Sequence, residues 1–191
     1  MTDQPRDITG PERPTSLSEL RAFLDEDLAA RARGGHGPEP ITGWVALRVF
    51  RLGQYLTVAS GPVASILRPL WKFLDFFWVR LLLNSEMMPD VSCGPGLVLP
   101  GGARRIIFPE GAVFGSRVTV NNGACLGGKR PRPVIGDDVV LWNDSYIVRG
   151  AVVGRGAHIG PWATVMKDVP AGGRAMGTPA TLLPDGEDFD F

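Results

Sequence analysis

Residues Ile135–Val165 read IGDDVVLWNDSYIVRGAVVGRGAHIGPWATV, and this stretch decides the fold. An aliphatic side chain returns every six positions, and a short or small side chain tends to follow four positions later. A period of six is neither the period of about 3.6 of an α-helix nor that of about 2 of a half-buried strand. It is typical of a solenoid in which very short strands alternate with turns. The aliphatic residues are Ile135, Leu141, Ile147, Val153, Ile159 and Val165, and the small ones Val139, Ser145, Ala151, Ala157 and Ala163.

If three such hexads complete one triangular coil, residues eighteen positions apart stack on the same face. Leu141 then lies under Ile159, and Ile147 under Val165. The aliphatic residues point into a narrow interior that each coil buries against its neighbours. The positions between strands carry Gly, Asp, Asn and Pro, which suit tight turns. The alternative is an ordinary strand-rich sandwich in which this spacing arises by chance.

The N-terminal part of the chain has helical patterns instead. Residues 1–15 are polar and rich in proline, which predicts a disordered tail. Ser16 and Glu19 fit a capping box, and leucines at helical spacing predict a helix from Leu17 to Arg33. The glycine-rich run that contains His36 ends this helix and forms a linker.

Residues 41–83 are strongly apolar, and they predict two helices broken at Gly61-Pro62. The longest uncharged run, Leu52–Leu67, is too short to span a bilayer. The second helix, Val63–Leu83, is apolar almost all round, so we expect it to be buried at an oligomer interface. The competing interpretation is a helix that lies on a membrane surface.

The period of six starts imperfectly at Met87, with Cys93, Leu99, Phe108, Phe114, Val120 and Leu126 as interior residues. A basic, proline-containing segment then interrupts the period of six, which predicts a loop that protrudes from the coil. The chain is thus divided into a disordered tail (1–15), an α-helical N-terminal part (16–85), a β-helix (86–184) with a loop at 127–134, and a loose acidic tail (185–191).

Composition limits the possible functions. The chain has 20 basic and 20 acidic residues, so no global positive field favours nucleic acid. Two cysteines do not make a disulfide framework, and the N-terminus does not read as a signal sequence, so we expect a cytoplasmic protein. Only two histidines are present, which excludes a zinc site of three histidines, and we expect no metal.

Several segments together carry a family resemblance. In order they are GPGLVL (94–99), VNNGACLGG (120–128), a basic loop, IGDDVVL (135–141), VVGRGAHIG (152–160) and MGTPA (176–180). The chain resembles the serine acetyltransferase branch of the hexapeptide-repeat acyltransferases. The resemblance implies a mainly β fold, a left-handed parallel β-helix with an α-helical N-terminal part. It also implies a homotrimer, acetyl-CoA as co-substrate along a groove between neighbouring coils, and a histidine that takes the proton from the acceptor hydroxyl.

The chain departs from the family pattern at both catalytic histidines. The first aligns with the run Leu99–Gly102 and the second with Pro131–Pro133, and neither run contains histidine. His158 takes a position that is often lysine in the family. We therefore expect a CoA-dependent acyltransferase whose acceptor is a hydroxyl or amine of a small molecule or sugar other than serine. The alternative is a catalytically inactive homologue that acts as a scaffold or regulatory partner.

Three residues are candidates for catalysis. Asn122 lies at the corner that the resemblance assigns to the thioester, where an amide can position the acceptor or stabilise an oxyanion; the alternative is an ordinary turn asparagine. Glu86 is the counterpart of the acidic residue that orients the first histidine, and it is a candidate base. Arg132 stands in the run that replaces the second histidine.

The cofactor candidates follow the same resemblance. Gly127 and Gly128 allow the pantetheine to approach the backbone closely. Asn143 and Pro161 match small CoA-contacting residues, and Lys167 is a candidate for the CoA phosphates. Trp162, with Trp142 about one coil away, is a candidate wall for adenine or an acyl chain, or else a subunit contact. Cys125 is either an acyl acceptor or a packed thiol.

Overall fold

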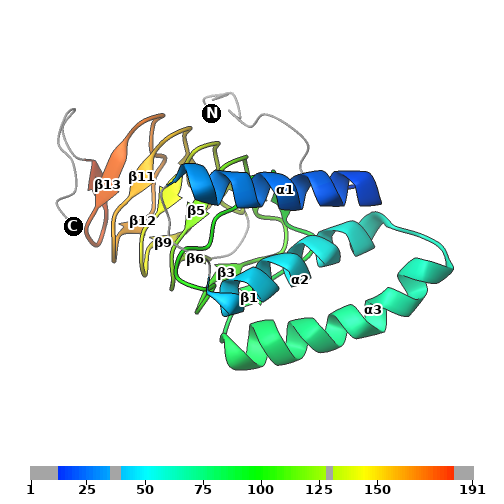
Figure 1. The fold of residues 1–191 in the computed structure, drawn as a ribbon. Helices are drawn as coiled ribbons and strands as arrows, with labels where there is room; N and C mark the ends of the chain where they lie inside the picture. Colours follow the sequence, from blue (N-terminus) through cyan, green and yellow to red (C-terminus); the bar gives the residue numbers. More distant parts are fainter. Residues whose placement is uncertain (1–12, 35–39, 128–130, 183–191) are drawn as a thin grey trace.

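The computed structural model describes residues 13–34, 40–127 and 131–182. Predictions for most of the N-terminal tail, His36, Gly128 and the acidic tail 185–191 lie outside these residues. Figure 1 shows a stack of coils with the helices beside its N-terminal end, α1 at one edge and α3 at the other. The prediction of a parallel β-helix with an α-helical N-terminal part is confirmed.

Two-residue strands form most of the three sheets, one on each side of the coil. All neighbours pair in parallel except the final β13–β14 pair, which is antiparallel. Sheet A contains β1 (Glu86–Met87), β3 (Ile107–Phe108), β6 (Cys125–Leu126), β9 (Tyr146–Ile147) and β12 (Thr164–Val165). Sheet B contains β2 (Ser92–Cys93), β4 (Val113–Phe114), β7 (Val134–Ile135) and β10 (Val152–Val153). Sheet C contains β5 (Thr119–Val120), β8 (Val140–Leu141), β11 (His158–Ile159), β13 (Arg174–Met176) and β14 (Thr181–Leu182).

The strand register confirms the predicted stacking. Leu141 pairs with Ile159, and Ile147 pairs with Val165. Every predicted interior residue from Cys93 to Val165 is at most 2% exposed, as the period of six requires. The small residues four positions later are buried as well, because they point inward near the corners.

The first helix has the predicted bounds, α1 (Leu17–Arg33). The Ser16 hydroxyl accepts a hydrogen bond from the Glu19 amide at 3.2 Å, so Ser16 is the N-cap. The Glu19 carboxylate accepts from both the amide and the hydroxyl of Thr15, each at 2.7 Å. The predicted capping box is therefore extended by one residue toward the N-terminus.

The apolar region forms α2 (Ile41–Val58), α3 (Pro62–Leu74) and a π-helical continuation, η1 (Asp75–Leu82). The break at Gly61-Pro62 is confirmed, and Gly61 has φ +102°, which glycine tolerates. The expected burial of the second helix at an oligomer interface stays a prediction, because the structure contains a single chain. Ala64, Asp75 and Val79 are buried, whereas an apolar face remains exposed because the chain places α2 against only one side.

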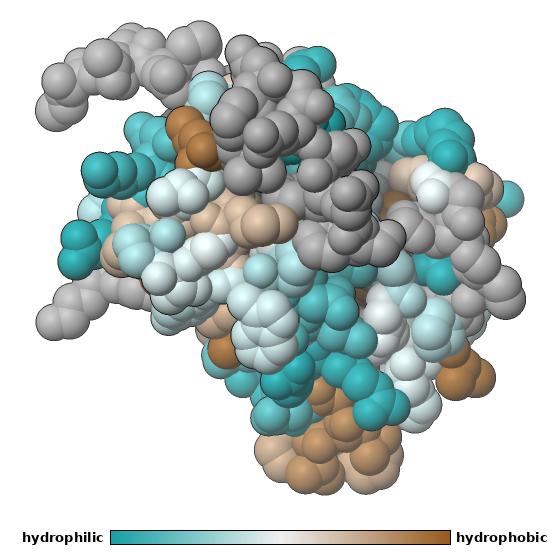
Figure 2. Space-filling model, turned by 90° about the vertical axis from the view of Figure 1, so that its left-hand side faces the viewer, coloured by the Kyte–Doolittle hydropathy of each residue, from teal (hydrophilic) through white to brown (hydrophobic). Residues whose placement is uncertain are grey.

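This exposed face, which we call the α3–η1 face, comprises Val63, Ile66, Leu70, Phe73, Phe76, Phe77, Leu81 and Leu82. Figure 2 shows hydrophobic surface gathered at the bottom of the molecule, the level at which α3 lies in Figure 1. The Phe73 and Phe77 rings stack with centroids 5.9 Å apart. Among the described residues, no helix is both long and apolar enough to cross a membrane.

A buried polar network joins the helices to the solenoid. Arg51 on α2 is fully buried and donates to both carboxylate oxygens of Asp27 on α1, at 2.9 and 2.8 Å. It also donates to the carbonyls of Cys93 and Gly94 in the first coil, at 2.7 and 2.8 Å. Asp27 in turn accepts from two amides of the loop that follows Gly94. The network thereby fastens two helices to one turn of the β-helix.

Candidate active site

Most of the site residues predicted from the sequence lie on two corners of the coil that flank sheet A. The C–A corner consists of turns that lead from sheet C to sheet A: 103–105, 121–123, 142–144 and 160–162. The A–B corner leads from sheet A to sheet B and contains Arg132 and Lys167. Asn122, Asn143 and Pro161 occupy equivalent positions in successive turns of the C–A corner, because the strands before and after them are in register.

The amide side chain of Asn122 forms hydrogen bonds within the C–A corner. Its Nδ2 donates to the carbonyl of Gly101 at 2.9 Å, and its Oδ1 accepts from the amide of Arg104 at 3.0 Å. A Cβ on Gly101 would lie 2.3 Å from Asn122 Nδ2, so a larger residue at this position would displace the Asn122 side chain. Of the two alternatives for Asn122, this geometry favours the one in which the side chain holds the turn.

The next residue of each turn forms a second column, Asn84, Arg105, Gly123, Asp144 and Trp162. Arg105 Nη2 donates to Asp144 Oδ1 at 2.8 Å across Gly123. A Cβ on Gly123 would lie 2.1 Å from the same oxygen, so the pair depends on this glycine. This ion pair is not among the contacts predicted from the sequence, although the coil spacing between Arg105 and Asp144 could have predicted it.

The two tryptophans take different positions in their turns and differ in exposure. Trp142 takes the first position of its turn and is half-buried, whereas Trp162 takes the third position and is 69% exposed. Their amides accordingly bond to different strands and turns, Trp142 to the Ile159 carbonyl and Trp162 to the Asn143 carbonyl. A groove walled by both tryptophans, and a contact of them with a neighbouring subunit, both stay predictions.

The outer face of sheet A lies between the corners and carries Glu86, Ile107, Cys125, Tyr146 and Thr164 in one row. A Cβ on Gly127 would lie 2.4 Å from the Tyr146 hydroxyl, so Gly127 makes room for this ring. Burial raises the pKa of the Cys125 thiol, which disfavours the thiolate that an acyl acceptor needs.

The three catalytic candidates do not meet within one chain. Glu86 lies on the edge strand β1 and faces Arg80, with their Oε1 and Nη1 atoms 3.4 Å apart. Asn122 precedes strand β6 at the C–A corner, whereas Arg132 follows it at the A–B corner, close to Gly111. A site that uses all three would need a surface completed from outside the chain.

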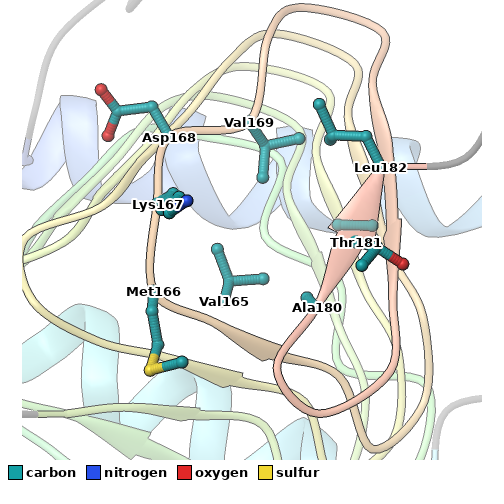
Figure 3. A pocket seen from close by; sticks show the side chains of 9 residues that line it. Val165, Met166, Lys167, Asp168, Val169, Ala180, Thr181 and Leu182 are labelled. Carbon is teal, nitrogen blue, oxygen red and sulfur yellow. The ribbon is translucent and has the colours of Figure 1, made fainter.

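Lys167 lies at the rim of a cavity of about 320 Å³ at the C-terminal end of the solenoid. The floor is apolar, with Val165 and Val169 pointing into the space, while Asp168 points away from it (Figure 3). Asp168 Oδ1 accepts from the Val152 amide at 2.8 Å, so this carboxylate holds the last turn. Lys167 therefore lies apart from the C–A corner, on the opposite side of strand β12.

The fold and its turns define a class, the hexapeptide-repeat β-helix. Residues 132–167 match the family described as bacterial transferase hexapeptide (six repeats). The chain is 32% identical over 170 residues to serine acetyltransferase 4 of Arabidopsis thaliana, covering 86% of this chain and 45% of the relative. It is 25% identical over 177 residues to the serine acetyltransferase of Synechococcus elongatus, covering 88% and 68%.

Solved structures agree on the fold. A serine acetyltransferase in complex with CoA superposes with a TM-score of 0.73 at 22% identity, covering 87% of this chain and 71% of the other. The soybean serine acetyltransferase apoenzyme gives a TM-score of 0.70 at 25% identity, covering 86% and 69%. The predicted resemblance to the serine acetyltransferases is thereby confirmed. The chain spans 45% of the length of the Arabidopsis relative and 68% of the Synechococcus one.

Proposed function

We propose that this chain is a CoA-dependent acyltransferase of the serine O-acetyltransferase type, which moves an acetyl group to a hydroxyl or amine of a small molecule. One observation carries the proposal. The likeness to a serine acetyltransferase runs through 170 residues, 86% of the chain, and so includes both the helical part and the solenoid. The acetyl-CoA co-substrate follows from the same likeness, and a cytoplasmic location stays a prediction.

The reaction needs a group that removes the acceptor proton, because an alcohol is a weak nucleophile at neutral pH. Glu86 is the proposed base, since its side chain is 48% exposed. Arg132 is proposed to bind an anionic part of a substrate from the A–B corner. Asn122 is proposed to act as a positioning residue, because both polar atoms of its amide hold Gly101 and Arg104.

The first experiment is calorimetric titration of the purified protein with acetyl-CoA and CoA, followed by a thiol-release assay with serine, other amino alcohols and sugars. Micromolar binding and release of CoA with one acceptor support the proposal. A folded protein that binds neither ligand would overturn it and favour a catalytically inactive homologue. Glu86→Gln should lower kcat strongly while leaving CoA binding intact, and Glu110→Gln serves as the matched control.

We also propose that the chain assembles as a homotrimer and that this assembly covers the α3–η1 face. Eight large apolar side chains, each at least 43% exposed, are too large a patch for a monomer to leave in water. Phe73→Glu should reduce the molar mass measured by light scattering. Leu28→Glu on α1 is the control, because both wild-type side chains are 61% exposed. Sedimentation of the wild type with anionic vesicles at an unchanged monomer mass would instead indicate a membrane contact.

A further inference from the structure

The C-terminal end of the solenoid contains an apolar cavity of about 320 Å³, which we call the end cavity. In the earlier coils, the predicted interior residues are 0% exposed, because the next coil covers each of them. Among the described residues, no further coil follows the last one, and Val165 and Val169 point into the open space (Figure 3). Terminal repeats of solenoids need a cap with a polar outer face. The end cavity is therefore the place where this solenoid needs its cap.

The rim of the end cavity combines exposed apolar atoms with a positive charge. Met166 is 37% exposed and Leu182 is 53% exposed. Of the described residues that line the cavity, Lys167 is the only cation and Asp168 the only anion. The Asp168 carboxylate points away from the cavity and accepts from the Val152 amide at 2.8 Å, so it is engaged with the last turn. A segment that joins large apolar side chains to carboxylates is complementary to such a rim.

The chain itself supplies a segment of this kind. It continues from Leu182, which lines the cavity, with LPDGEDFDF at 183–191. This stretch has two phenylalanines, four acidic residues and no basic residue. Phe189 and Phe191 alternate with aspartates, and successive side chains of an extended segment point to opposite sides. Both rings can thus face the apolar floor while the carboxylates stay outside, within reach of Lys167.

The size of the end cavity and the length of the segment are compatible with this arrangement. A cavity of roughly 150 Å³ holds one benzene ring, so about 320 Å³ has room for two phenyl groups. Phe189 is seven residues beyond Leu182 (189 − 182), and an extended chain of that length spans up to about 25 Å. Gly186 permits the turn that brings the rings back to the rim. Because the segment is attached at the rim, its effective concentration at the cavity is of millimolar order.

We propose that residues 185–191 of this chain occupy the end cavity, with Phe189 and Phe191 in the apolar space and the neighbouring carboxylates beside Lys167. The segment is the cap that the last coil needs, because its rings cover the apolar floor and its acidic residues form the polar outer face. The proposal does not rest on the proposed function. It gives Lys167 a partner within the chain, whereas the family resemblance assigns this residue to the CoA phosphates.

The test is carbodiimide cross-linking of the full chain, which joins a lysine to a carboxylate in contact with it, read by mass spectrometry. Lys167 should be joined to an acidic residue of 185–190, whereas Lys72, which is exposed on α3 beside the other end of the stack, should not (Figure 1). Combined Phe189→Ser and Phe191→Ser substitutions should remove most of this product and lower the thermal midpoint by at least about 2 °C. Leu17→Ser, which removes an apolar side chain that is 60% exposed on α1, is the control and should change neither.

Three results would overturn the proposal. An unchanged Lys167 product in the phenylalanine variant would mean that charge alone attracts the segment. No product at Lys167, or equal yields at Lys167 and Lys72, would mean that the segment does not occupy the end cavity. A mixture of isotope-labelled and unlabelled chains identifies the source of the segment, and products that join the two kinds of chain would assign the cavity to the segment of a second copy.

Discussion

The solenoid and the helical part bury their side chains in different ways. In the solenoid, one aliphatic and one small residue in every six face the interior, and each coil repeats the contact made by the coil before it. In the helical part, the contacts do not repeat: Arg51 and Asp27 form a buried network, and an apolar face stays open. A repeated contact can be predicted from spacing alone, whereas a single long-range contact cannot.

The largest expected effect comes from breaking the network between these two regions. Asp27→Asn leaves the fully buried Arg51 without its counter-ion and should lower the free energy of unfolding by about 3–5 kcal/mol. Chemical denaturation measures the change. The control is Asp25→Asn, whose carboxylate is exposed and lies 3.9 Å from Arg21, with an expected change below about 1 kcal/mol. Equal effects for the two variants would mean that the network does not hold the regions together.

A substitution inside the solenoid should cost somewhat less. Leu141→Ala opens a cavity in the stacked interior and should lower the free energy of unfolding by about 2–4 kcal/mol. Val140→Ala, which removes apolar atoms from the outward-facing neighbour, should cost less than about 1 kcal/mol. Equal denaturation midpoints for Leu141→Ala and Val140→Ala would contradict the prediction that Leu141 faces inward and Val140 outward.

A smaller effect is expected at the start of α1. Ser16→Ala removes the acceptor for the Glu19 amide and should cost about 1 kcal/mol. Ser65 on α3 is the comparison, because its hydroxyl donates to the Gly61 carbonyl and caps no amide. Ser65→Ala should therefore change the thermal midpoint less than Ser16→Ala, and the opposite order would show that the cap is not important for stability.

The smallest effect concerns acid stability at the turns that lead from sheet B to sheet C. Hydrogen bonds from Arg117, at 2.6 and 2.8 Å, lower the pKa of Asp138. A lowered folded-state pKa contributes stability above the ordinary value near pH 4, and this contribution is lost as the pH falls through the lowered pKa. Asp138→Asn should leave stability at pH 7 within about 1 kcal/mol of wild type.

Below about pH 4, the stability of Asp138→Asn should fall less steeply with pH than that of the wild type. Asparagine tolerates the left-handed backbone at this position, where φ is 59°, so the substitution isolates the charge. Asp25→Asn, at an exposed helical site, is the matched control. Parallel pH profiles for Asp138→Asn and the wild type would show that the Arg117 pair does not contribute.

At the candidate site, the sequence predicted the positions of residues but not the contacts of their side chains. The hexad phase placed Asn122, Asn143 and Pro161 at one corner, and the strand register agrees. The spacing of the hexads did not predict that both polar atoms of the Asn122 amide form hydrogen bonds, or that Gly127 accommodates the Tyr146 ring. These depend on side-chain direction, which the spacing does not encode.

The sequence by itself determined the solenoid, the stacking of Leu141 under Ile159, the bounds of α1 and the break at Gly61-Pro62. Each of these rests on local periodicity or on a cap, because the interacting residues are close in sequence or separated by one coil. Only the tertiary structure decided that Arg51 joins two helices to the first coil, that the α3–η1 face stays exposed, and that Trp162 is more exposed than Trp142. Such features depend on how distant segments pack, and packing fixes which face of a helix or turn is left to solvent.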